Sequence, residues 1–328
     1  MLNKAYDSNY KGFDKVVPLT TEEATDRKNY ASWLDHRSFM DISLTQFFLM
    51  VKEELRIHDP EGRVALSGTP TVHNPYSGYN WEMLMKKVFA GQFLFPYGGL
   101  QQEFQRSFAT KDTRILPPRG YTTVGKPVIN STWNDAFYYK GVGWYYFTSS
   151  VALNEDFTFS RQLSDLLDAS ADLRQGIGRI LMEADNVYDG IAVLYSQGSM
   201  RMTSILGDGN KFVSNLRGWS DLLHEAGWKY KFVGAEDIKG LLNAGYTTLI
   251  LPYNTMLDTD EIADIRKYVS KGGILIADIA AGVYNRHGRK YKTDPMARIF
   301  GISRPDGQVV SGQLIPEASW LSQNRRGK

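Results

Sequence analysis

The sequence contains no cysteine and no apolar run long enough to cross a lipid bilayer. Without cysteine, its 328 residues provide no disulfide, no thiolate ligand for zinc and no thiol nucleophile. No stretch approaches the roughly 20 apolar residues of a transmembrane helix, and residues 1–15 lack the apolar segment of a signal peptide. We therefore expect no membrane association. The sequence does not determine the cellular compartment, and a cytoplasmic location is favoured.

The chain also has little excess charge of either sign. Lys and Arg total 38 against 36 for Asp and Glu, so the formal net charge is +2 at pH 7. This balance produces no long-range field that would attract nucleic acid, and we predict no nucleic-acid partner. The five histidines show no i, i+4 pair and no H-E-x-x-H motif, so local spacing predicts no metal site.

Apolar and aromatic residues are plentiful. Hydrophobic residues make up 42% of the chain, which is enough for a packed core in each of two domains. Aromatic residues make up 13%, with 19 Tyr and 7 Trp, and many of them precede residue 150. Flat rings often stack on ligands, and sugars are one such class of ligand.

Strand and helix patterns alternate through the first half of the chain. A capped helix start is predicted at Thr20 or Thr21, and apolar spacing from Trp33 to Ile57 predicts a long amphipathic helix that ends before Pro60. Short strand patterns then alternate with helix patterns, which implies a parallel sheet. The predicted strands cover residues 63–69, 92–99, 113–123 and 141–149. A closed (β/α)8 barrel needs eight strands, so these four correspond to half a barrel.

The second half has the pattern of a doubly wound α/β domain. A predicted helix over residues 157–184 leads into a polar segment, which indicates a domain boundary. The strands predicted after it cover residues 191–196, 230–234, 247–253 and 274–280, and the helices cover 212–227, 236–245 and 258–273. The predicted fold class is α/β: a partial (β/α)8 barrel, about strands five to eight, over residues 1–185, followed by a flavodoxin-like doubly wound α/β domain over residues 186–328.

The segment after the strand at 191–196 bears on a cofactor. Flavodoxin-like sheets often bind phosphates there, but QGSMRMTSILGDGNK has neither G-x-G-x-x-G nor the end of a P-loop, so a solvated loop is expected. No G-x-S-x-G elbow supplies a nucleophile, and we predict that this domain is not catalytic. A flavodoxin-like nucleotide binder stays a third reading, which predicts FMN or a nucleotide in the purified protein.

Candidate ligand-binding residues lie near the ends of the predicted strands of the first half, where a β/α barrel collects its functional groups. Aromatic rings could stack on the apolar face of a sugar while amide and guanidinium groups bond its hydroxyls. Core packing explains some of them equally well. The predicted substrate-binding residues are His73, Asn74, Tyr79, Trp81, Tyr97, Arg119, Tyr121 and Trp133.

Glycoside hydrolysis normally needs two carboxylates on either side of the bond that breaks. Glu103 is the leading catalytic candidate, because it follows the YGG exit of a predicted strand. A glutamate in a first helical turn is also ordinary complementation of the helix dipole. For Glu82, Asp35, Asp112 and Asp135, positions on solvated faces are the preferred interpretation.

A series of segments resembles a known family. LNKAYDSNYKGFDKVVPLTTEEA, followed by NYASWLDHRSFMD, DPEGRVALSGT, SGYNW and RSF, is similar to the middle of family-42-like β-galactosidases, and the resemblance continues through GIGRIL and the α/β domain. It implies barrel strands five to eight followed by the trimerisation domain of that family. It also implies a β-galactoside substrate, retaining chemistry, no cofactor and a homo-oligomer, namely a trimer.

The resemblance has two departures at the catalytic positions. In the family the acid/base glutamate ends barrel strand four, upstream of the segment that matches Leu2-Asn3, so no residue here takes that position. The nucleophile glutamate belongs at the end of strand seven, yet no glutamate occurs from Phe104 to Trp144. We therefore expect the chain to be inactive alone. The alternative hypothesis is a non-catalytic carbohydrate-binding or assembly protein.

Overall fold

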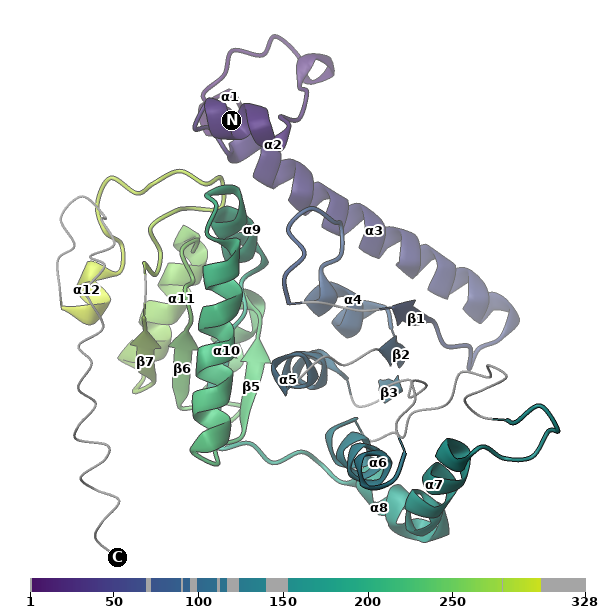
Figure 1. The fold of residues 1–328 in the computed structure, drawn as a ribbon. Coiled ribbons are helices and arrows are strands. Elements are labelled where there is room, and N and C mark those ends of the chain that lie inside the picture. The colour runs from purple at the N-terminus through teal and green to yellow at the C-terminus, as the bar shows by residue number, and fades with distance from the viewer. Residues whose placement is uncertain are drawn as a thin grey trace, which may run out of the picture.

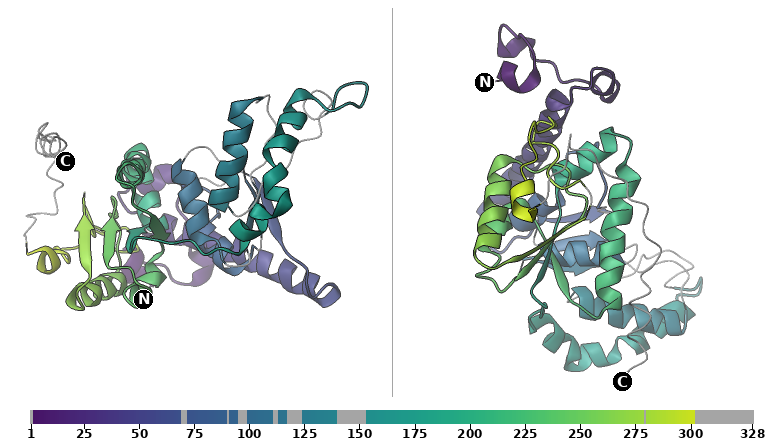
Figure 2. Two further views of the ribbon diagram at one scale, coloured as in Figure 1. Left: turned by 90° about the horizontal axis from the view of Figure 1, so that it is seen from below. Right: turned by 90° about the vertical axis from the view of Figure 1, so that its left-hand side faces the viewer.

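The computed structural model describes residues 2–68, 72–89, 91–94, 99–110, 113–116, 124–139, 153–278 and 280–301. Each half of the described chain contains one parallel sheet with helices around it (Figure 1). The long helix that precedes the first sheet runs along one border of the molecule, away from the second sheet. The two views in Figure 2 show the same arrangement.

The N-terminal segment forms short helices, one of which starts where the sequence predicts. α1 (Leu2–Tyr6) and the 3-10 turn η1 (Phe13–Lys15) precede α2 (Thr21–Asp26). Thr20 Oγ1 accepts a hydrogen bond from Glu23 N (3.2 Å), and Thr20 N donates one to Glu23 Oε2 (2.9 Å). This reciprocal pair satisfies backbone groups that the first helical turn leaves open. The predicted helix start is confirmed.

The longest helix, α3 (Ala31–His58), has apolar residues on two opposite faces. One face packs toward the core, where Leu34 is buried and Phe48 contacts Phe89 with ring centroids 5.3 Å apart. The opposite face also carries large apolar side chains, and these are exposed. The predicted helix over residues 33–57 is confirmed, but it is not simply amphipathic, because it presents a second apolar stripe to solvent.

The first sheet is built from βα units, as the alternating pattern predicts. In chain order its elements are β1 (Ala65–Gly68), α4 (Trp81–Lys87), β2 (Gly91–Leu94), α5 (Gly99–Phe108), β3 (Arg114–Leu116) and α6 (Lys126–Tyr139). The strand order is β1-β2-β3, and both pairings are parallel. The predicted parallel sheet is confirmed over these three strands. The fourth predicted strand, residues 141–149, lies outside the described residues.

The helix predicted over residues 157–184 is divided in the structure. α7 (Arg161–Ala169), the π-helical turn η2 (Leu173–Ile177) and α8 (Gly178–Glu183) follow one another. Gly176 lies at the break with φ of 142°, a backbone conformation that favours glycine. The prediction of one continuous helix was therefore wrong, and glycine supplies the physical reason.

The second sheet has four parallel strands in the order β5-β4-β6-β7. The strands are β4 (Ile191–Leu194), β5 (Tyr230–Val233), β6 (Thr248–Leu251) and β7 (Ile274–Ala277). The helices and turns around them are α9 (Gln197–Ile205), α10 (Gly209–Glu225), the 3-10 turn η3 (Ala235–Gly240), α11 (Thr259–Ser270) and α12 (Ala297–Phe300). Buried residues of α10 pack on one face of the sheet, and those of α11 pack on the other. This explains why the strands are rich in apolar residues.

Two local predictions in this half are corrected. Residues 197–211, expected to form a solvated loop, contain helix α9, which starts at the cap Ser196 and buries Met200 and Met202 completely. The segment 236–245, expected to be a short α-helix, forms the 3-10 turn η3 and further turns. In the first case, burial of apolar side chains outweighs a polar, glycine-containing local sequence.

One continuous core joins the two halves. Phe104 of α5 lies 4.7 Å from the ring of Tyr195, just after β4, and both belong to the larger hydrophobic cluster. Phe232 N, in the edge strand β5, donates a hydrogen bond to Ser107 Oγ of α5 (2.8 Å). Helix α5 therefore covers the edge of the second sheet, which would otherwise expose unpaired backbone groups. The proposed boundary near residue 185 stays a prediction.

Candidate functional site

The segment from Val72 to Trp81, between β1 and α4, carries four of the predicted substrate-binding residues. It crosses from the first half to the second: Tyr195 Oη, beyond β4, donates to Val72 O (2.9 Å), and Gln197 Nε2 of α9 donates to Tyr79 O (3.3 Å). The second half therefore holds this segment in place. His73, Asn74, Tyr79 and Trp81 all belong to this segment or to the first residue of α4.

His73 lies against helix α9. Its Nε2 is 2.9 Å from Ser204 Oγ, and Ser204 Oγ also donates to Met200 O (2.6 Å). Gly209 packs so closely that an added Cβ would lie 2.8 Å from His73 Nε2. Burial lowers the pKa of His73, which favours the neutral imidazole. A neutral imidazole beside a hydroxyl can donate or accept hydrogen bonds.

The aromatic residues of the segment form a stack. The rings of Tyr79 and Trp81 lie 5.5 Å apart with an interplanar angle of 9°. Trp81 is only 6% exposed, so its ring is part of the core. Asn80 caps α4, because its Oδ1 accepts a hydrogen bond from Met83 N (3.1 Å).

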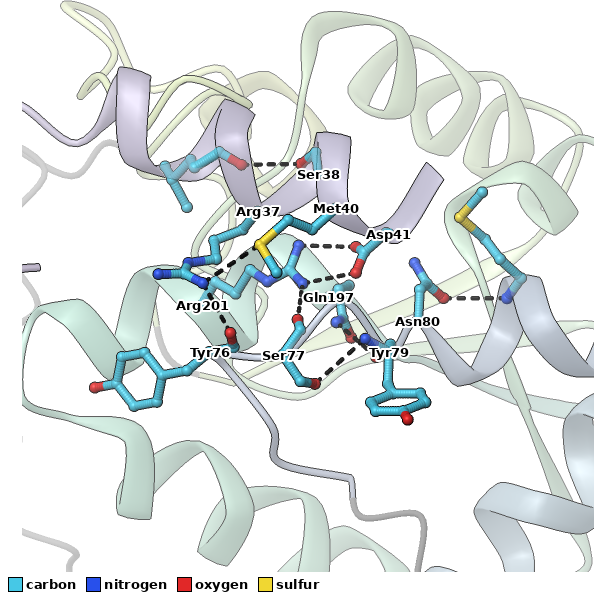
Figure 3. A network of polar contacts seen from close by, with 12 residues as sticks. Arg37, Ser38, Met40, Asp41, Tyr76, Ser77, Tyr79, Asn80, Gln197 and Arg201 are labelled. Atoms are coloured by element: carbon cyan, nitrogen blue, oxygen red, sulfur yellow. Dashed lines mark hydrogen bonds and ion pairs between the residues drawn. The ribbon is translucent and has the colours of Figure 1, made fainter. Parts of the chain in front are cut away.

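A buried ion pair fixes this segment between α3 and α9 (Figure 3). Arg201 Nη1 and Nη2 each lie 2.8 Å from an oxygen of Asp41, and the two side chains are 2% and 5% exposed. Arg201 Nη2 also donates to Ser77 O (3.0 Å), and Arg37 Nη1 donates to Tyr76 O (2.8 Å). Burial raises the pKa of Asp41, and the bonds from Arg201 oppose that rise.

Glu103, the catalytic candidate, lies on α5 and faces the second half. The residue is 1% exposed, and its Oε2 lies 2.5 Å from Arg106 Nη2. His224 Nε2 of α10 is 3.7 Å from Oε1. Burial raises the pKa of Glu103, while Arg106 lowers it less strongly. The guanidinium of Arg106 also lies 5.2 Å from the ring of Tyr138 and 5.5 Å from that of Tyr188.

A cavity of about 420 Å³ opens beside Glu103, between α5, α6, α8 and the end of α10. Its walls combine aromatic rings with both signs of charge. The lining residues are Glu103, Arg106, Phe137, Tyr138, Leu181, Ala184, Asp185, Asn186, Val187, His224, Gly227, Trp228, Lys229 and Tyr230. The volume lies within the range of small-molecule sites. Glu103 lies on a helix, and its carboxylate forms an ion pair. Its role as a catalytic residue stays a prediction.

The remaining predicted residues lie elsewhere. Trp133 is half-buried on α6, where its ring is 6.0 Å from that of Phe137. Tyr97, Arg119 and Tyr121 lie outside the described residues. Four of the candidates thus lie in the segment 72–81, and Glu103 lies at the cavity.

Sequence reasoning missed the ion pair and most of the cavity. Asp41 and Arg201 are separated by 160 positions, and Arg201 lay in a segment expected to be a loop. His224 lies in the last turn of α10, and Trp228 and Lys229 lie just after this helix, without a motif. The one signal in the sequence for a buried charge was a charged residue between apolar residues. Arg201, between Met200 and Met202, is such a residue.

The carboxyl end of β4, where this type of sheet often binds phosphates, is closely packed. Ser196 Oγ accepts the N–H of Ser199 (3.0 Å), and an added Cβ on Gly198 would lie 2.0 Å from the Met256 methyl group. Among the residues that the structure describes, no group of three His, Asp or Glu side chains could hold a metal ion. None of the described helices is long and apolar enough to span a bilayer.

Solved structures share this arrangement. Neither a protein-family model nor a curated protein matches the sequence. The β-galactosidase from Bacillus circulans sp. alkalophilus matches with a TM-score of 0.71 at 15% identity, over 91% of this chain and 49% of that one. A catalytic mutant of a GH42 β-galactosidase from G. stearothermophilus matches with a TM-score of 0.70 at 15% identity, over 89% and 48%. This chain has the fold of one half of a family-42 β-galactosidase.

The family-42 fold also occurs with a different substrate. An exo-carrageenase of GH42 from Bacteroides ovatus matches with a TM-score of 0.65 at 15% identity, over 89% of this chain and 45% of that one. The chain spans about half the length of these structures. At this level of identity the likeness establishes the fold, including the parallel first sheet as part of the family-42 barrel.

Proposed function

We propose that this chain is the C-terminal half of the catalytic barrel, plus the following α/β domain, of a retaining glycoside hydrolase that acts on β-galactosides. The proposal rests on the family-42 fold, because the match covers about nine-tenths of this chain but only about half of each matched structure. The sequence adds the ordered family-42-like segments before and after the first sheet. The carbohydrate partner is thus a β-galactoside, in a site that needs residues from both halves of the barrel.

Alone, the chain is inactive. Retaining hydrolysis needs an acid/base and a nucleophile about 5–5.5 Å apart, and the family's acid/base position precedes the segment that matches Leu2-Asn3. Glu103 does not replace either group readily, because its carboxylate is bonded to Arg106 and it stands on α5 rather than at the end of a strand. Active sites of β/α barrels are built at the carboxyl ends of the strands.

The second half is a flavodoxin-like assembly domain, and the oligomer is a trimer. The order β5-β4-β6-β7 corresponds to the first four strands of the flavodoxin-like order 2-1-3-4-5, which supports this class. The edge strand β7 exposes Ile274 and Ile276, with 57% and 38% of their surface accessible, and these residues could be buried by association. Measuring the mass of the protein in solution tests whether it forms a trimer.

A nitrophenyl β-galactoside assay tests the activity. It is applied to this chain and to the gene product extended upstream, with the mass of each measured in solution. We expect turnover only from the extended product. Turnover by this chain alone would refute the missing-acid argument. If neither form is active, the alternative is favoured, namely a non-catalytic carbohydrate-binding or assembly protein, for which the buried, ion-paired state of Glu103 is the supporting observation.

A further inference from the structure

The cavity of about 420 Å³ lies at the amino-terminal ends of the strands. Two of its walls are the last turns of α6 and α10, which carry Tyr138 and His224. A helix that connects parallel strands runs antiparallel to them, so its last turn reaches the level at which those strands begin. Tyr230, the first residue of β5, also lines the cavity, and the connection from α8 to β4 passes this end of α10 (Figure 1). The segment 72–81 follows a carboxyl end and so belongs to the other end of the sheets.

The charged groups of the cavity balance one another. Glu103 and Arg106 form an ion pair in its wall, with side chains only 2% and 12% exposed. Asp185 and Lys229 add one exposed charge of each sign, so the described lining residues have no net formal charge when His224 is neutral. A strong anion would meet no excess of positive charge here, and an apolar ligand would cover charged groups without bonding them, which is costly. The lining therefore favours a neutral ligand with many hydrogen-bonding groups.

Two aromatic rings of the lining are exposed. Phe137 of α6 and Trp228, just after α10, have 58% and 55% of their surface accessible. Helix α5 packs against both α6 and α10, so the two rings come from different walls. The flat face of such a ring can cover the apolar face of a sugar, while polar side chains bond the hydroxyls. Asn186, also in the lining, carries an amide that can both donate and accept hydrogen bonds.

The wall that carries Trp228 is fixed by backbone contacts. Gly227 ends α10 with φ of 77°, and Trp228 N donates a hydrogen bond to Leu223 O (2.9 Å). Asp189 N donates to Lys229 O (2.9 Å), and Lys229 N donates to Asp189 Oδ2 (2.6 Å). This reciprocal pair joins the turn after α10 to the segment before β4. A site that is already formed loses less conformational entropy when its ligand binds.

We propose that this cavity binds a neutral disaccharide. Trp228 and Phe137 stack on the sugar rings, and Asn186, Asp185 and Lys229 bond the hydroxyls. The volume of about 420 Å³ lies within the range of small-ligand sites. The proposal uses only the residues of this cavity, so it does not depend on the proposed β-galactosidase activity.

Titration calorimetry of this chain with lactose, cellobiose and maltose measures the binding at pH 7, and galacturonate and glucose 6-phosphate serve as charged probes. We expect saturable binding of at least one of the three disaccharides, weaker binding of both anions, and little effect of added salt because the ligand is uncharged. Hydrogen exchange of the same samples should slow in peptides that cover residues 134–139 and 222–230. No saturable binding of any disaccharide, tighter binding of an anion, or slower exchange confined to other peptides would overturn the proposal.

Substitutions of exposed aromatic residues separate sugar binding from folding. Trp228→Ala and Phe137→Ala should each weaken binding about tenfold or more, because each removes a ring that stacks on the sugar. Phe159→Ala is the matched control, since Phe159 is also 58% exposed but is not among the residues that line the cavity. All three variants should keep urea midpoints near that of wild type, because the replaced side chains are exposed. Unchanged binding by Trp228→Ala, or equal weakening by Phe159→Ala, would contradict the assignment.

The same samples separate this site from the proposed function. If the cavity binds a disaccharide but neither this chain nor the extended gene product hydrolyses nitrophenyl β-galactoside, the proposed function is refuted and the sugar site is supported. If the extended product is active but no disaccharide binds at the cavity, the proposed function is supported and the sugar site is refuted.

Discussion

Replacing Asp41 with Asn should destabilise the protein strongly, although Asp41 lies on no predicted catalytic segment. The change keeps the shape of the side chain but removes the charge that two nitrogens of Arg201 contact at 2.8 Å. The side-chain oxygen of Asn can accept only some of the hydrogen bonds that the guanidinium of Arg201 donates. Arg201 would then be a buried cation, 2% exposed, that still donates a hydrogen bond to Ser77 O.

The expected cost follows from the burial of both partners. Removing one member of a buried pair leaves an uncompensated charge in a poorly solvated site, and such changes cost about 3–5 kcal/mol. An exposed pair provides the matched control. Arg179 and Glu183 on α8 are 84% and 67% exposed, so Glu183→Gln should change stability by no more than about 1 kcal/mol.

Urea unfolding followed by tryptophan fluorescence measures both variants at pH 7. Asp41→Asn should lower the urea midpoint, while Glu183→Gln should leave it nearly unchanged. The double variant Asp41→Leu, Arg201→Met should recover much of the loss, because well-packed apolar residues replace a buried ion pair at little net cost. If Asp41→Asn shifts the midpoint no more than Glu183→Gln, the pair does not hold α3, α9 and the segment 72–81 together, and the reasoning is wrong.

Further variants probe the cavity, the histidine and two glycines. Burial raises the pKa of Glu103 more strongly than Arg106 lowers it, so the ionised carboxylate does not favour the folded state, and Glu103→Gln should cost little stability at pH 7. As pH falls, folded Glu103 takes up a proton before the unfolded chain does, so wild type should gain stability relative to Glu103→Gln. Because burial lowers the pKa of His73, the unfolded chain binds a proton below about pH 6.5 while folded His73 stays neutral. Stability should thus fall between pH 7 and 5, and less so in His73→Gln. Gly190→Ala should cost about 1–3 kcal/mol, since φ is +72° and its Cβ would lie 2.9 Å from a carbonyl oxygen, whereas Gly218→Ala, in open space on α10, should gain up to about 1 kcal/mol. Urea midpoints over this pH range test all four.

The elements with strong periodicity could be predicted, and most were. Apolar runs such as IAVL and TLIL become β4 and β6 because both faces of a parallel sheet are covered by helices. The reciprocal cap at Thr20 is readable from four consecutive residues. Strand ends were less accurate: of the strand predicted at 63–69, the described residues 63 and 64 precede β1, which begins at Ala65.

The errors occurred where distant burial outweighs local preference. Residues 197–205 contain a glycine and three serines or threonines, yet they form α9, because the fold buries Met200 and Met202. The break at Gly176 shows the opposite case, in which one glycine interrupts a pattern that looked continuous.

Local pattern was therefore sufficient for the alternation of strands and helices, the parallel sheets and the approximate place of the segment 72–81. These follow from side-chain spacing within a few residues. The pairing of Arg201 with Asp41 and the burial of Glu103 against α10 depend on contacts between residues more than a hundred positions apart. No periodicity encodes such contacts, because they arise only when α5 packs against β5 and α10, and α9 packs against α3, so that water is excluded from the charges on these helices.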